Sequence, residues 1–110
     1  MLKILDIPEI KLISINEKYV NRRYTLSSKY RAFKDLIGHS VKKHNVKPPY
    51  ELLVKMETYL DIDNCLKPII DAIEHTLTND RDIYKLTVEK KPLKRGKPGR
   101  LQIFISELII

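Results

Sequence analysis

Apolar side chains recur with a period of two in several runs of the chain, and this period predicts strands. Successive side chains of a strand point to opposite faces of a sheet, so alternation marks one buried face. Runs of this kind cover residues 51–60, 83–90 and 101–107. An earlier run rich in Ile and Leu covers residues 3–15 and contains Pro8. Because proline cannot donate to a neighbouring strand, this first strand is expected at an edge of the sheet or split at Pro8.

Two further segments have apolar residues at helical spacing. In residues 28–45 these residues recur every three or four positions, and one of the serines at 27–28 is placed to cap the start. Residues 64–77 carry a second apolar stripe. Pro68 is expected in the first turn of this second helix, where its missing N–H costs little. Residues 61–64 then form the corner between strand and helix.

The elements follow in the order β-α-β-α-β-β and predict one domain, residues 1–110. A chain of 110 residues with 43% hydrophobic and 32% charged residues suffices for one compact core and is too short for two. The predicted class is α+β, a small mixed sheet with two helices. The last two strands are expected to pair as a β-hairpin, with the basic, Pro- and Gly-containing residues 91–100 at its tip.

The charges of the chain are unevenly distributed. The chain has 21 Lys and Arg against 14 Asp and Glu, and the formal charge of +7 favours a polyanionic partner such as nucleic acid. Residues 90–100 hold six positive charges and no acid, so they are expected to bind DNA phosphates; a solvated loop is the alternative. The predicted DNA-binding residues are Arg22, Arg23, Lys90, Lys91, Lys94, Arg95, Lys97 and Arg100.

The acids are concentrated instead in residues 61–82, which contain six acidic and only two basic residues. Asp61 and Asp63 point to the same side at a strand end, and the connection after the second helix can return Asp80 to the same corner. Converging carboxylates repel one another, and a hard cation such as Mg²⁺, or Mn²⁺ as the alternative, relieves the repulsion. Lys67 is placed to stabilise charge that develops on a phosphate. Otherwise these residues are helix caps, turn residues and a solvated ion pair.

Cys65 is the single cysteine, which excludes an internal disulfide and a zinc cage. Cys65 is expected to be a small core residue. No run of about 18 apolar residues is present, and Lys3 and Asp6 interrupt the apolar start, so neither a membrane span nor a signal peptide is expected. These features predict a cytoplasmic protein without a membrane partner.

The acidic segment resembles that of the RusA family of Holliday junction resolvases. That family has an Asp-x-Asp-Asn-x-x-Lys-x-x-x-Asp segment, an acidic pair in a loop, and a strand that leads through a basic Gly-containing hairpin to a final strand. The matching residues here are Asp61, Asp63, Asn64, Lys67 and Asp71, then Asn79 and Asp80, then Lys90, Lys91, Gly99 and Arg100. Residues 14–19 and 24–27 also look like the family's early loop, so the resemblance covers nearly the whole chain.

The resemblance implies a Mg²⁺-dependent endodeoxyribonuclease, a homodimer that makes paired, symmetric cuts in four-way DNA junctions during recombination and repair. It implies that Asp61, Asp63 and Asp80 bind the metal and that Lys67 is the catalytic lysine. Small resolvases of this kind often occur in phages and prophages. This chain departs from the family twice: Asn79 replaces the first acid of the pair, and Glu-Thr-Tyr-Leu at 57–60 stands where arginines often precede the first aspartate.

Two other functions are compatible with these residues. A non-catalytic regulator that binds DNA or RNA would use the basic segment and would need the aspartates only as caps and turns. A metal-dependent nuclease of another specificity would act on flaps, single strands or RNA. Stabilisation by magnesium distinguishes a metal site from caps and turns, and a panel of substrates distinguishes the nucleases. The apolar residues 108–110 are a candidate dimer contact.

Overall fold

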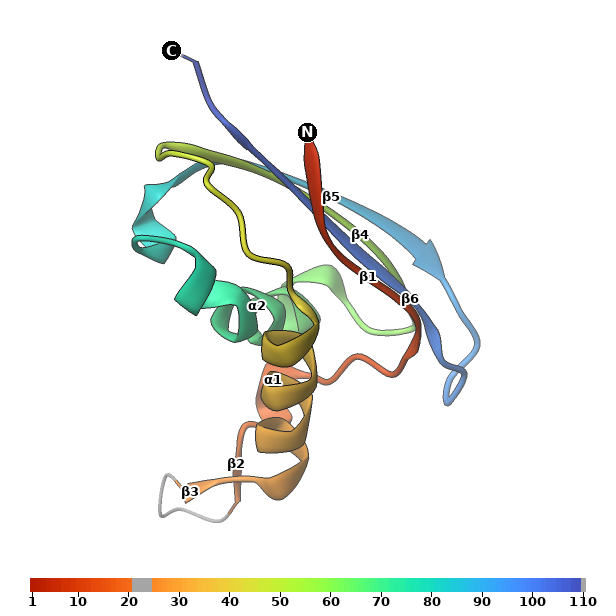
Figure 1. Ribbon diagram of the computed structural model, residues 1–110. Coiled ribbons are helices and arrows are strands. Elements are labelled where there is room, and N and C mark those ends of the chain that lie inside the picture. Colours follow the sequence, from red (N-terminus) through yellow and green to blue (C-terminus); the bar gives the residue numbers. More distant parts are fainter. Residues whose placement is uncertain (21–24, 110) are drawn as a thin grey trace.

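A sheet covered on one face by two helices forms the structure, a computed structural model that describes residues 1–20 and 25–109 (Figure 1). The strands of the sheet are β1 (Leu2–Ile10), β4 (Tyr50–Thr58), β5 (Ile83–Pro92) and β6 (Gly99–Glu107), and the helices are α1 (Ser28–Ser40) and α2 (Ile62–Ile73). The smaller described elements are the ribbon of β2 (Tyr19–Val20) and β3 (Thr25–Leu26) and the 3₁₀ helices η1 (Ile15–Glu17), η3 (Glu74–Thr76) and η4 (Asp80–Asp82). The predicted α+β class and the order β-α-β-α-β-β of the main elements are confirmed.

The strands lie in the order β1-β6-β4-β5, which differs from their order in the chain. β4 and β5 are parallel and are connected through α2, whereas β6 lies antiparallel between β1 and β4. The predicted hairpin of the last two strands is therefore wrong, because β4 separates β5 from β6. Burial explains the order: Leu101, Ile103 and Ile105 on β6 are fully buried and suit a central strand, whereas no residue of β5 is buried.

The first strand lies at the edge of the sheet, as Pro8 predicted. Its pairing with β6 shifts register between Ile7 and Ile10. Opposite Ile10, the backbone of Gly99 approaches β4 so closely that a Cβ atom there would lie 2.5 Å from the Cβ and carbonyl oxygen of Glu57. Only glycine therefore fits where β6 begins.

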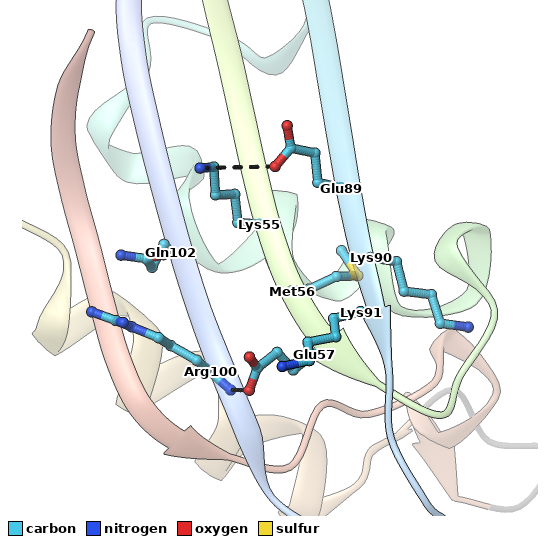
Figure 2. Close-up of a pocket in the computed structure, with 8 residues that line it drawn as sticks. All are labelled: Lys55, Met56, Glu57, Glu89, Lys90, Lys91, Arg100 and Gln102. Carbon is cyan, nitrogen blue, oxygen red and sulfur yellow. Dashed lines mark hydrogen bonds and ion pairs between the residues drawn. The ribbon is translucent and has the colours of Figure 1, made fainter.

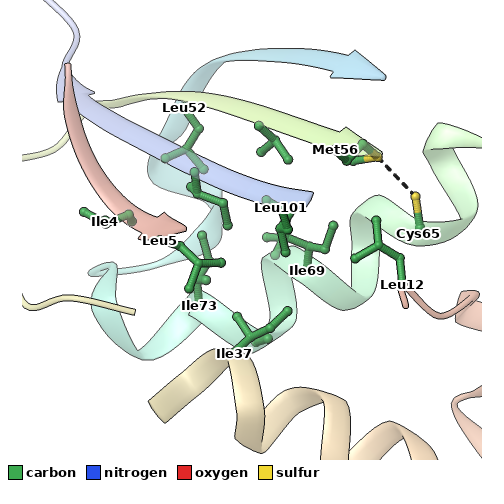
Figure 3. Packing of buried hydrophobic residues seen from close by; sticks show 14 of the residues in the cluster. Ile4, Leu5, Leu12, Ile37, Leu52, Met56, Cys65, Ile69, Ile73 and Leu101 are labelled. Atoms are coloured by element: carbon green, nitrogen blue, oxygen red, sulfur yellow. Dashed lines mark hydrogen bonds between the residues drawn. The ribbon is translucent and has the colours of Figure 1, made fainter. Parts of the chain in front are cut away.

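One face of β4 forms the base of the core (Figure 3). Leu52, Val54 and Met56 on this face are at most 2% exposed, as the alternation in the sequence predicted. From α2, the fully buried Ile69 joins the same cluster. Cys65 is buried as well, and its Sγ lies 3.4 Å from the Sδ of Met56, which confirms that it is a core residue.

The first helix begins where predicted and ends earlier. The Oγ of Ser27 accepts a hydrogen bond from the N–H of Tyr30 at 3.0 Å and caps α1. The helix ends at Ser40, not near residue 45. The N–H of Lys42 donates to the carbonyl of Ile4 at 2.7 Å, so the chain after α1 docks onto β1 in an extended form.

The second helix begins earlier than predicted, at Ile62, and ends at Ile73. Pro68 is therefore not in the first turn but in the second, where it cannot donate to the carbonyl of Asn64. Pro68 is buried on the apolar side of α2, and burial of this side holds the helix together around it. Within residues 1–20 and 25–109, no helix is long and apolar enough to cross a membrane.

We expect Ile37→Ala to lower the free energy of unfolding by about 2–5 kcal/mol, because it opens a cavity at a fully buried position of α1. The neighbouring Leu36 is 48% exposed, so Leu36→Ala should change this free energy by less than about 0.5 kcal/mol. Urea denaturation followed by circular dichroism measures both values. Equal losses in the two variants would contradict the described packing.

Candidate active site

Asp61 and Asp63 lie at the corner where β4 gives way to α2. Asp61 is the N-cap residue of α2, yet its side chain makes no capping hydrogen bond. Asp63 lies in the first turn, and its Oδ1 accepts a hydrogen bond from the N–H of Asn64 at 3.0 Å. Both aspartates are exposed. Two solvent-facing carboxylates thus lie at the positive end of a helix and offer oxygen atoms to a cation.

Lys67 lies one turn after Asp63, about 6 Å further along the axis of α2. Its Nζ lies 3.1 Å from Oδ1 of Asp71 and 4.0 Å from Oδ2 of Asp80. The hydrogen bond to Asp71 raises the pKa of Lys67 above its ordinary value, so the amine is charged at neutral pH. Lys67 therefore supplies a fixed positive charge between Asp63 and the turn that holds Asp80.

Asp71 connects this region to the rest of the fold. Its side chain is 15% exposed, the Tyr30 hydroxyl donates to Oδ2 at 2.9 Å, and Nζ of Lys18 lies 3.7 Å from the same oxygen. Burial raises the pKa of Asp71, but the hydrogen bonds from Tyr30 and Lys67 outweigh burial and leave the pKa below its ordinary value. One ionised carboxylate thereby joins α1, α2 and the residue that follows η1.

Asp80 is the first residue of η4, and the residue before it caps this short helix. Asn79 caps η4, because its Oδ1 accepts a hydrogen bond from the N–H of Arg81 at 3.0 Å. An amide oxygen is sufficient for this bond, so Asn79 has a structural role that needs no negative charge. The side chain of Asp80 is 41% exposed and lies beside Lys67.

The parallel crossover separates Asp80 from the other two predicted metal ligands. Asp61 follows the carboxyl end of β4, whereas η4 leads into Ile83, which pairs with Tyr50 at the opposite end of β4. In the described part of the chain, no three Asp, Glu, His or Cys side chains are grouped so that they could hold a metal ion. The structure brings Asp80 to Lys67 and leaves Asp61 at the corner with Asp63.

Residues 93–98 form an exposed loop, here called the basic loop, against the same corner. The N–H of Leu93 donates to the carbonyl of Thr58 at 3.2 Å, which fixes the loop to the end of β4. The cations of the loop are Lys94, Arg95 and Lys97. The guanidinium carbon of Arg95 lies 5.9 Å from the ring centre of Tyr59. These positive charges therefore lie beside the residues that lead to Asp61.

The other predicted DNA-binding residues differ in their surroundings. Lys90 and Lys91 line a hollow of about 300 Å³ on the sheet, together with Arg100 (Figure 2). Arg100 is already engaged, because its Nε and Nη2 donate to the two carboxylate oxygens of Asp6 at 2.9 and 2.8 Å. This fork holds the pKa of Asp6 well below its ordinary value and ties β6 to β1. The predicted contacts of residues 22 and 23, both arginines, lie outside the described residues.

Several residues of this region were not singled out in the sequence. Lys11 and Lys29 line a second hollow together with Lys97 of the basic loop and with the acids Glu17 and Glu57, so cations outside residues 90–100 also lie near the loop. Nζ of Lys29 lies 2.6 Å from Oε1 of Glu17. The contacts of Lys18 and Tyr30 with Asp71 were also missed, although Asp71 itself was among the residues that carry the resemblance. The residues of each contact are far apart in the chain, so no local sequence pattern predicts the contact.

The site combines two exposed carboxylates, a charged lysine whose partner Asp71 is mostly buried, and a basic loop that contacts the residues just before the carboxylates. No protein-family model matches the sequence, and a search of curated proteins finds no significant match. The function is therefore inferred from the residues and their geometry.

We expect Asp71→Asn to lower the free energy of unfolding by about 1–3 kcal/mol at pH 7, because charge-assisted hydrogen bonds are lost in a largely buried place. The folded pKa of Asp71 lies below the ordinary value of 3.8. Its stabilisation is therefore fully present above that value and is lost as the pH falls through the folded pKa. Urea denaturation from pH 7 to pH 3 should show the difference between wild type and variant shrinking at the acid end.

The matched control is Asp35→Asn, at an exposed position of α1. This variant should differ little from the wild type at any of these pH values. A difference for Asp71→Asn that stays constant down to pH 3 would show that ionisation of Asp71 does not contribute.

Proposed function

We propose that this chain is a Mg²⁺-dependent, structure-specific endodeoxyribonuclease that cuts four-way DNA junctions as a homodimer. The observation that carries the proposal is the contact of the basic loop with Thr58 and Tyr59, the residues that lead to Asp61 and Asp63. Leu93 and Arg95 of the loop reach the two residues that end β4 and begin this corner. A DNA backbone held by the loop would pass beside exposed carboxylates, which is the arrangement that phosphodiester hydrolysis requires.

The residues at the corner fit a hard divalent cation. Mg²⁺ in enzymes that act on phosphates is usually held by one or two carboxylates, with water and the substrate phosphate as the other ligands. Asp61 and Asp63 supply two such carboxylates before DNA binds. Asp80 was predicted as a third ligand, but it lies beside Lys67 and apart from this pair, so the proposed protein ligands are Asp61 and Asp63 alone. When bound, Mg²⁺ would lower the pKa of a water molecule and neutralise charge on the scissile phosphate.

Lys67 is the proposed catalytic lysine. Asp71 holds the amine at 3.1 Å and keeps it charged, so the cation is present before the substrate arrives. A fixed cation at this place stabilises negative charge that develops on the phosphate or on the leaving oxygen. Asp71 acts through Lys67 and is a positioning residue, itself held by Tyr30.

Paired, symmetric cuts in a junction need two equivalent sites, and a two-fold dimer supplies them. The formal charge of +7 per chain is doubled in such a dimer, which favours binding to the closely spaced phosphates of a junction. The proposal therefore includes a homodimer with one candidate site in each chain.

A non-catalytic DNA-binding protein is the second candidate, and one observation favours it. Lys67 and Asp71 form an ion pair of the common i, i+4 type, which needs no catalytic explanation. In that case Asp61 is only a helix N-cap residue, Asn79 only caps η4, and the basic loop keeps its role. A nuclease specific for flaps or single strands would use the same residues as a resolvase, so substrates must distinguish the two.

In the presence of Mg²⁺, the wild type should cut a synthetic four-way junction in symmetric pairs and leave linear duplex of the same sequence intact. We expect Asp63→Asn to bind the junction and to lose at least about 100-fold in cleavage rate, because a ligand of the cation is removed. Gel assays of binding and cleavage measure both effects on one substrate.

Asp35→Asn on α1 removes the same charge far from the corner and should leave cleavage unchanged. If the wild type binds the junction and cuts nothing in Mg²⁺ or Mn²⁺, the non-catalytic role replaces the proposed one. Faster cleavage of flaps or single strands than of the junction would retain the chemistry and change the substrate.

Binding should weaken steeply with salt, since phosphate contacts release counterions. Replacement of Lys94 and Lys97 by alanine should weaken junction binding and reduce the slope of log affinity against log salt by about 1 for each lost contact. Lys34→Ala, at an exposed position of α1, should change neither quantity. Fluorescence anisotropy with labelled junction measures them, and an unchanged slope in the loop variant would show that the loop does not bind phosphates.

A further inference from the structure

β5 leaves one edge of the sheet uncovered. It is the last strand in the order β1-β6-β4-β5, and no strand of the described chain lies beside its outer edge. None of its ten residues is buried, and the apolar side chains of Tyr84 and Leu86 are 63% and 41% exposed. A long, exposed edge strand presents a row of backbone N–H and C=O groups to another strand. β5 is therefore the part of the sheet best suited to extend it.

The charges of β5 match those of a second copy of the same strand. When two copies of one strand pair antiparallel around a two-fold axis, one residue of the strand lies on the axis, opposite its own copy. A residue a given number of positions before this central residue then lies opposite the residue the same number of positions after it in the second copy. With Thr87 at the centre, Lys85 lies opposite Glu89 of the second copy, and Leu86 lies opposite Val88. Both pairs occur twice in the dimer. Opposite charges and apolar groups that face each other across a strand pair stabilise it.

Neighbouring registers lack this complementarity. With Val88 at the centre, Lys85 would lie opposite Lys91 of the second copy, and like charges that face each other destabilise a strand pair. With Leu86 at the centre, Glu89 would lie opposite Ile83, and no charged pair forms between residues of the two β5 strands. The sequence of β5 thus favours one register over the two adjacent ones.

The charges on the outer face of the sheet extend this match beyond β5. Within one chain, Nζ of Lys85 lies 3.4 Å from Oε2 of Glu51. Nζ of Lys55 lies 3.8 Å from Oε2 of Glu89 in the same way (Figure 2). The side chains of Lys85 and Glu89 remain 59% and 60% exposed, so each has room for a second partner. Across the two-fold axis the side chains would form one row of alternating sign, in the order Glu51, Lys85, Glu89, Lys55.

We propose that β5 is the homodimer interface of this protein, with two antiparallel β5 strands centred on Thr87 that join two sheets into one. The inference rests on the homodimer of the proposed function and specifies its interface, but the association itself needs neither DNA, nor a metal ion, nor Asp61, Asp63 or Lys67. It also differs from the contact suggested by the apolar residues 108–110: the N–H of Leu108 donates to the carbonyl of Pro49 within the chain.

The test is the mass in solution, measured by light scattering on a size-exclusion column without DNA or metal. The wild type should have twice the chain mass of 13.0 kDa. Lys85→Glu places acid opposite acid at both cross-strand pairs and should raise the dissociation constant of the dimer at least about tenfold. Glu89→Lys places lysine opposite lysine and should do the same. An equal mixture of the two variants restores opposite charges at both pairs, so it should form a heterodimer.

Lys34→Glu, the same charge inversion on α1, should leave the mass unchanged. A monomeric wild type, single variants that dimerise like the wild type, or a mixture that stays monomeric would each overturn the inference. Because the mixture must restore association, misfolding of a variant cannot imitate the expected result. A stable dimer that never cuts a junction would remove the proposed nuclease activity and keep this inference. A monomer that cuts junctions would keep the activity and remove both this inference and the homodimer of the proposed function.

Discussion

The position of β4 constrains everything else in the structure, because this strand is paired on both sides and buried on one face. Its parallel pairing with β5 forces the chain to return along the sheet, and α2 makes that return over the buried face. Twelve helical residues cover about 18 Å, so the corner of Asp61 and the turn of Asp80 lie far apart. The candidate site is therefore spread along a helix, and Lys67 in the middle links its two parts.

The same helix couples the candidate site to the core. One side of α2 carries Ile69 and its apolar neighbours, while Asp71 lies at the border of that side and holds Lys67. Tyr30 is 1% exposed, and its hydroxyl reaches Asp71 from α1. The place of the lysine cation therefore depends on how the two helices pack, because its partner Asp71 is held by Tyr30 of α1.

The helices, the strands and the buried face of β4 could be predicted from the sequence, because each depends on residues that are close together in the chain. Alternation identified the buried face of β4, the serines at 27–28 were recognised as candidate caps of α1, and the apolar stripe of residues 64–77 identified most of α2. Features that depend on distant partners could not be predicted. Apolar residues with a period of two indicate a strand but do not indicate which strand it pairs with, so β5 and β6 were wrongly predicted to pair. Pro68 is tolerated inside α2 only because tertiary packing holds the helix.

The insertion of β6 between β1 and β4 has a consequence for how the protein is made. β1 and β4 have no hydrogen bonds to each other in the sheet; both are paired to β6. During translation, the β4-α2-β5 unit can assemble first, while β1 must wait for a partner that emerges almost a hundred residues later. Contacts between residues so distant in the chain slow folding. Until β6 is made, β1 and β4 each have an unpaired edge, to which another nascent chain or a chaperone can bind.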